Sequence, residues 1–109
     1  SVSSTINANY IGNITLSPEK PYTMSDMIVS SDISRDGRMI LIKTYYQIFL
    51  INRDLKLDFS SILEEKQIRL EYIVEPQGEA ICWDWAQSGY FTISEQHGKT
   101  PVHLYYYSN

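Results

Sequence analysis

Two stretches of this chain follow the same plan and lie about fifty residues apart, at residues 31–51 and 79–107. Each reads as an apolar strand, a tight polar turn with a glycine, and then two further strands. Repeated units with periods of roughly 20 to 50 residues stack on one another, because a single unit cannot bury its apolar face alone. The sequence therefore predicts an all-β fold built from antiparallel meanders.

The composition is that of one globular domain, which we expect to span residues 1–109. Hydrophobic residues make up 43% of the chain, yet no segment approaches the roughly 20 apolar residues of a membrane span. The net charge is -4, and the nine lysines and arginines are scattered, whereas nucleic-acid binding depends on clustered cations. We therefore expect neither membrane insertion nor a nucleic-acid partner.

Cys82 is the only cysteine, so an intrachain disulfide cannot form. Its place in an apolar run predicts a buried packing thiol. The sequence has no recognisable signal peptide, and its start at Ser1 fits either a processed protein or an excised fragment. The compartment stays open, with a periplasmic or secreted location favoured.

Turn and capping signals divide the chain into elements. Asp36 and Gly37 form a hairpin signal between two apolar runs, and Ser61 with Glu64 matches a capping box that predicts a short helix near residues 59–66. A strand is predicted at 10–16, before the first unit. The strands predicted for the first unit lie at 27–33, 39–45, 48–51 and 67–74, and the second unit, at 78–107, has three strands.

Residues 33–42, ISRDGRMILI, resemble the TolB-like and WD-repeat-like repeats of bacterial β-propellers, although Arg35 stands where those repeats usually have proline. Residues 78–95, GEAICWDWAQSGYFTISE, resemble the repeat of phytase-like, esterase-like and gluconolactonase-like propellers, with WAQSG in place of the usual turn. The resemblance covers roughly residues 27–107 and implies two propeller-like blades, at about 27–74 and 78–107. A closed propeller needs at least about four blades.

This shortage of blades leads to the functional hypothesis. The strand expected at 10–16 has no blade before it, so it can supply an outer strand within this chain or to a neighbouring copy. We therefore expect a binding or assembly module that self-associates through an unpaired edge strand, as a homo-oligomer. The chain can equally be the remainder of a larger propeller, or a small open pair of sheets.

Glu79 and Glu95 carry the alternative hypothesis. A hairpin centred near Gln87 places the two carboxylates almost opposite each other, where like charges repel unless a divalent cation or a shared proton neutralises them. In the propellers that the second unit resembles, the glutamate that opens the inner strand is a metal ligand, and Glu79 matches that position. The alternative is a metal-assisted hydrolase that uses Ca²⁺ or another divalent cation. The simpler interpretation is a pair of solvated carboxylates and no cofactor.

Three further residues are candidates for binding. Trp85 lies in the second turn and is expected to be exposed, as aromatic residues of binding surfaces are. Asp32 is the acidic residue of the first unit, and it can either bind a ligand or satisfy backbone groups of the neighbouring turn. Lys43 is a charged residue in an apolar strand, and it can either face a channel or protect a sheet edge.

Overall fold

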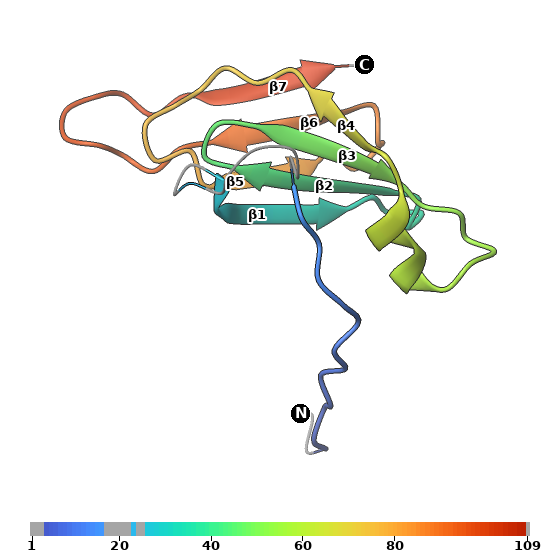
Figure 1. Ribbon diagram of the computed structural model, residues 1–109. Coiled ribbons are helices and arrows are strands. Elements are labelled where there is room, and N and C mark those ends of the chain that lie inside the picture. The colour runs from blue at the N-terminus through green and yellow to red at the C-terminus, as the bar shows by residue number, and fades with distance from the viewer. Residues whose placement is uncertain (1–3, 17–22, 24–25, 109) are drawn as a thin grey trace.

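The computed structural model describes residues 4–16, 23 and 26–108 (Figure 1). In this part of the chain the fold is nearly all-β, with seven antiparallel strands arranged in two sheets. This arrangement confirms the predicted all-β class. Among the described residues, no helix is long and apolar enough to cross a membrane.

The first sheet is a four-stranded meander in which neighbours in sequence are neighbours in space. Its last strand ends four residues earlier than predicted, because Leu70 pairs with Ile48, the first residue of the preceding strand, and the chain beyond Leu70 has no strand to pair with. The strands are β1 (Ile28–Ile33), β2 (Met39–Thr44), β3 (Ile48–Asn52) and β4 (Gln67–Leu70).

The second sheet has the three strands that were predicted, β5 (Ala80–Trp83), β6 (Gly89–Ile93) and β7 (Leu104–Ser108). The first turns of the two sheets have the same hydrogen-bond pattern, displaced by fifty positions. The amide of Ser34 donates to Met39 O at 2.8 Å, and the amide of Asp84 donates to Gly89 O at 3.0 Å. Each turn contains a residue with positive φ, 78° at Gly37 and 60° at Gln87.

One face of each sheet packs against the other sheet. Leu41 and Ile48 of the first sheet form a buried cluster with Ile81 and Tyr90 of the second. We call the face of the first sheet that contains Leu41 and Ile48 its shared face. Burial of apolar side chains between sheets is the main favourable term in such a structure.

Polar contacts join β1 to β5 beside this core. The side chains of Ser30 and Asp32 accept hydrogen bonds from the amides of Ile81 and Trp83, at 3.3 Å and 2.8 Å. These bonds satisfy donors on the free edge of β5, which would otherwise face the neighbouring strand without a partner. The tips of the two hairpins are also tied together. The amide of Asp36 donates to the Gln87 side chain at 2.8 Å.

The opposite face of the first sheet is capped by other parts of the chain, and we call it the capped face. Ile40, Ile42 and Ile51 of this face form a second buried cluster with Ile62 of the 3-10 helix η2 (Phe59–Glu64). The short helix predicted near 59–66 is therefore present. The predicted capping box is not, since the helix begins after Asp58 and has no side-chain cap.

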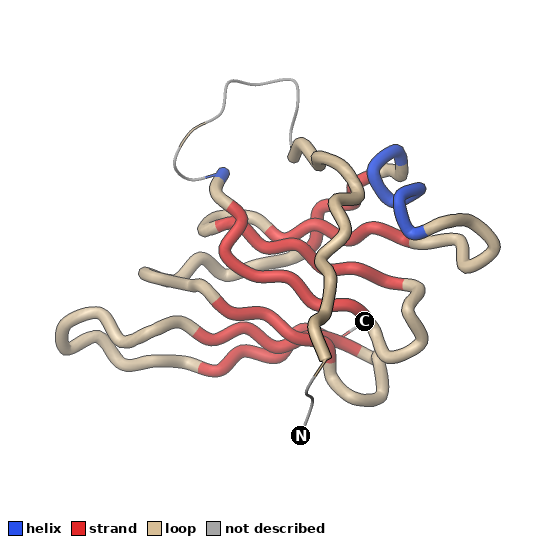
Figure 2. The backbone as a smooth tube through the Cα atoms, turned by 90° about the horizontal axis from the view of Figure 1, so that it is seen from below, coloured by secondary structure: helices blue, strands red, loops and turns tan. Residues whose placement is uncertain are grey.

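The strand predicted at 10–16 is not formed: the described residues of the N-terminal segment, 4–16, contain no strand. In Figure 2 the segment passes in front of the strands, but Figure 1 shows that most of it projects away from the sheets, and residues 4–11 are all exposed. Ile14 and Leu16 pack on the capped face, and the carbonyl of Thr15 accepts a hydrogen bond from the Gln67 side chain at 2.8 Å. Only the end of the described segment thus covers apolar side chains, and none of its described residues adds an outer strand to either sheet.

Candidate functional site

The second sheet has one face that neither buried cluster includes, within the part of the chain that the structure describes. Directly paired residues of an antiparallel sheet share a face, and so do alternate residues of one strand. By this register the outward residues are Ala80, Cys82, Gly89, Phe91, Ile93, Leu104, Tyr106 and Ser108. We call this surface the open face. Its side chains carry no formal charge at neutral pH.

The open face is accessible and its aromatic side chains are ordered by contacts within the sheet. Leu104 is 64% exposed, and Tyr106 and Ile93 are also exposed. The ring centroids of Phe91 and Tyr106 are 4.8 Å apart. Tyr106 lies over Gly89, where a Cβ would come within 2.6 Å of its hydroxyl group, and that hydroxyl donates to Asp84. An exposed apolar surface of this kind is typical of a protein interaction site.

Cys82 lies on the open face and is exposed, which corrects the prediction of a buried thiol. Both sides of β5 are apolar, so an apolar run could not indicate which side is covered. Partial desolvation and, to a smaller extent, the nearby Asp32 carboxylate raise the pKa of the Cys82 thiol. The thiol is thus accessible but is not activated as a nucleophile.

The open face corresponds in position to the shared face of the first sheet. Cys82, Phe91 and Ile93 stand fifty positions after Asp32, Leu41 and Lys43, and those three residues belong to the shared face by the register of β1 and β2. Likewise the inward side chains of β6 stand fifty positions after the isoleucines of the capped face. The two sheets therefore stack in the same direction, and the open face is where a third sheet would continue the stack.

Asp32 and Trp85, two of the predicted binding residues, lie at the junction of the sheets. Asp32 accepts from the amides of Trp83 and Ile33, so it takes the role of satisfying backbone groups. Trp85 is 77% exposed, as expected for its place in the turn, and the Arg35 guanidinium lies 4.5 Å from the centre of its ring. A binding role for either residue stays a prediction.

Lys43 is buried completely, on a strand that has neighbours on both sides. It therefore does not protect a sheet edge. Its ammonium group donates to the carbonyls of Thr44 and Gly78 and lies 4.3 Å from the centre of the Tyr72 ring. Desolvation lowers the pKa of Lys43 to about 8, against the opposing influence of the nearby Glu75 and Glu79 carboxylates.

Glu79 and Glu95 are not paired across the hairpin. Ala80 pairs with Ile93, so the continued register places Ser94 opposite Glu79. Tyr45 donates to Glu79 at 2.7 Å, which, more than any other influence, raises the pKa of Tyr45. Among the described residues, no group of three or more His, Cys, Asp or Glu side chains is placed to hold a metal ion.

Comparisons with known proteins give no relative: no family model, no curated protein and no solved structure matches this chain. The resemblance to propeller repeats therefore stays a prediction from the sequence.

Proposed function

We propose that this chain is an assembly module, built from two blade-like sheets, that self-associates through the open face of its second sheet. The observation that carries the proposal is the exposed, uncharged surface around Leu104 and Tyr106, in the position where the first sheet has its covered shared face. Burial of apolar area at this surface supplies the driving force for association.

A second copy of this chain is the partner that the surface favours. The chain has a net charge of -4, so copies repel one another over most of their surfaces. The side chains of the open face are uncharged and, among the described residues, only the Asp84 carboxylate is bound at its margin, by Tyr106, so the repulsion is weak where two copies would meet, and the face gives no advantage to a partner of opposite charge.

The two copies would meet open face to open face. If copies stacked in the same direction as the two sheets of one chain, the open face of one copy would contact the capped face of the next. Ile14, Leu16 and η2 already cover that capped face. A contact between two identical surfaces closes by a twofold axis, the commonest symmetry of soluble oligomers. Self-association thus moves from the edge strand expected from the sequence to a sheet face.

The test measures molecular mass by light scattering across the micromolar concentration range. We expect the unaltered chain to form a dimer and Leu104→Glu to remain a monomer, because the new carboxylate would be buried against its symmetry mate. The control is Leu57→Glu, which alters a half-exposed leucine in the loop before η2 and should leave the dimer intact. A monomeric unaltered chain, or a dimer that persists in Leu104→Glu, overturns the proposal.

The position of Cys82 gives a second, independent readout of the same interface. A dimer joined by open faces shields the two thiols from solvent, so modification of Cys82 by a maleimide should slow as the dimer forms. The modification rate should not depend on protein concentration in Leu104→Glu. A rate that stays constant across the dimerisation range in the unaltered chain contradicts the proposed face.

A further inference from the structure

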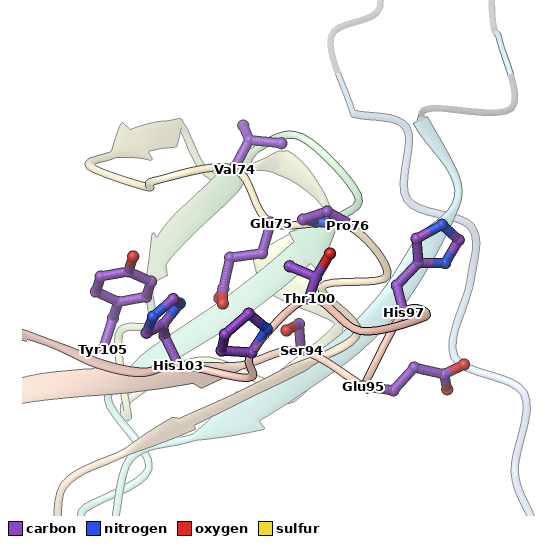
Figure 3. Close-up of a pocket in the computed structure, with 10 residues that line it drawn as sticks. Val74, Glu75, Pro76, Ser94, Glu95, His97, Thr100, His103 and Tyr105 are labelled. Carbon is purple, nitrogen blue, oxygen red and sulfur yellow. The ribbon is translucent and has the colours of Figure 1, made fainter.

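A small hollow lies between the connection from β4 to β5 and the loop that joins β6 to β7 (Figure 3). Its volume is about 120 Å³. Glu75 enters it from the first segment, and Ser94, Thr100, His103 and Tyr105 line it from the second. None of these residues belongs to the open face, so the hollow is a separate feature of the molecule.

Glu75 forms the floor of the hollow. The residue is only 8% exposed, and its side chain points between His103 and Thr100 (Figure 3). Its Oε1 atom is buried and has no hydrogen-bond partner. A buried acceptor without a donor is destabilising, and more so when it is charged. A donor that reached this carboxylate from the hollow would relieve that cost.

A tight turn holds Glu75 in position. The amide of Gly78 donates to the Glu75 carbonyl at 3.2 Å, with Pro76 and Gln77 between them. Gln77 has φ of 54°, in the left-handed region that turns of this type usually reserve for glycine. Such unfavourable backbone geometry persists when the surroundings fix it, and it is found preferentially at functional sites.

The ammonium group that acts electrostatically on Glu75 is hydrogen-bonded elsewhere. Lys43 influences Glu75 electrostatically, yet its ammonium hydrogen bonds go to two backbone carbonyls. The positive charge helps the protein to tolerate a buried carboxylate, but it supplies no donor to Oε1. A cationic donor from outside the chain would provide one.

The walls restrict the shape of that donor. The Tyr105 ring, Pro101 and Val74 offer apolar contact, and Ser94 and Thr100 contribute hydroxyl groups. A cavity of about 150 Å³ holds a molecule of the size of benzene. A hollow of about 120 Å³ accordingly suits a chain of four carbons that ends in an ammonium group.

We propose that this hollow binds an aliphatic primary ammonium group, whose N–H donates to Glu75 while its carbon chain lies against Tyr105. The proposal does not depend on self-association. The same group occurs in free alkylamines and at the end of a lysine side chain, and the experiment separates these two sources.

The test is a titration followed by backbone amide NMR shifts, with n-butylammonium chloride as the probe. We expect saturable shifts confined to the amides of Val74, Glu75 and the non-proline residues of 94–105, with a dissociation constant in the millimolar range. n-Butanol, which has the same carbon chain without the charge, should bind at least about tenfold more weakly, since a hydrogen bond to a charged group contributes about 1.5–3 kcal/mol.

Variants assign the binding to Glu75. Glu75→Gln keeps the size of the side chain and should weaken butylammonium binding at least about tenfold. Glu64→Gln, which alters an exposed carboxylate in η2, is the matched control and should bind as the unaltered chain does. Thr100→Phe fills the hollow from an exposed position, and it tests the site by another route if Glu75→Gln fails to fold.

The probes distinguish a lysine side chain from a free amine as the ligand. Butylammonium and Nα-acetyl-lysine methylamide binding with similar affinity identifies a lysine side chain as a ligand, whereas binding of butylammonium alone identifies a free amine. Equal affinities for butylammonium and butanol overturn the proposal. So do unchanged binding in Glu75→Gln or Thr100→Phe, and an absence of saturable shifts at these residues.

Discussion

The two sheets differ in how completely they are covered. The first has four strands, buried side chains on both faces, and a link of three residues, 45–47, between β2 and β3. The second has three strands, one open face, and a link of ten residues, 94–103, between β6 and β7. The two sheets therefore differ in role. The first sheet supplies most of the buried core, and the second carries the open face and borders the hollow, the two places where we propose binding.

The largest expected effect comes from truncating a buried side chain of the first sheet. Ile48 is fully buried, and Ile48→Ala should lower the free energy of unfolding by about 2–5 kcal/mol, because it loses apolar burial and leaves a cavity. Leu104→Ala, on the open face, should change it by less than about 0.5 kcal/mol at protein concentrations too low for association. Urea unfolding measures both, and equal losses would contradict the division of roles.

The buried Lys43 makes stability depend on pH. Its pKa is about 8 in the fold and 10.5 ordinarily, so the unfolded chain binds more protons between these values, and stability should rise with pH through this range. The full gain is about 3 kcal/mol. Urea unfolding between pH 8 and 10 should measure the effect, in the Cys82→Ser variant. The substitution is needed because the pKa of the Cys82 thiol is raised in the fold, so that its ionisation in the unfolded chain lowers stability as the pH rises.

Lys43→Met in the same background is the control for this pH dependence. The variant lacks the titrating group, so its stability should not rise between pH 8 and 10. A rise that survives in Lys43→Met would show that another group is responsible. Above this range Tyr90 acts in the opposite direction, because burial raises its pKa to about 12 and the unfolded chain ionises first.

The junction between the sheets should be sensitive to Asp32. Asp32→Ala removes the acceptor of the Trp83 amide, which should cost about 1–2 kcal/mol and speed hydrogen exchange at that amide. Asp54→Ala is the matched control, since Asp54 also accepts from a backbone amide, that of Lys56, but in an exposed loop. Trp83 exchange that is unchanged in Asp32→Ala would mean that the edge of β5 is protected in another way.

The smallest expected effect is that of calcium. Glu79 already accepts from Tyr45, and no third described ligand lies beside Glu79 and Glu95. Millimolar calcium should therefore leave the melting temperature unchanged. A clear rise that is lost in Glu79→Gln would instead support the metal-assisted hydrolase hypothesis, and it would place function at the start of β5.

The strands and the Asp36–Gly37 turn were predictable because their signals are local. Apolar runs and turn residues specify which segments are strands, and neighbouring strands of a meander then pair in order. The segment 10–16 was wrongly predicted as a strand, because apolar residues at that spacing suit a strand and an extended segment on a sheet face equally well. The choice depends on a distant partner, the capped face.

The candidate site was less predictable, because it depends on register and on distant contacts. The sequence predicted that the hairpin of β5 and β6 is centred at Gln87, but the observed pairing centres it between residues 86 and 87. This difference shifts the pairing by one residue, and a shift of one residue places a side chain on the other face of the sheet. Glu79 and Glu95 therefore do not oppose each other. Glu75 lies in a segment predicted only as a break between strands, and its burial depends on the distant loop at residues 94–103.

The bond from the Asp36 amide to Gln87 has a consequence for how the joint between the sheets is specified. Gln87 occupies a left-handed turn position that glycine would adopt with less strain. Glycine, however, has no side chain to reach the other hairpin. The turn of the second hairpin is therefore less stable than a glycine turn would be, but the Gln87 side chain fixes the orientation of this hairpin relative to the first.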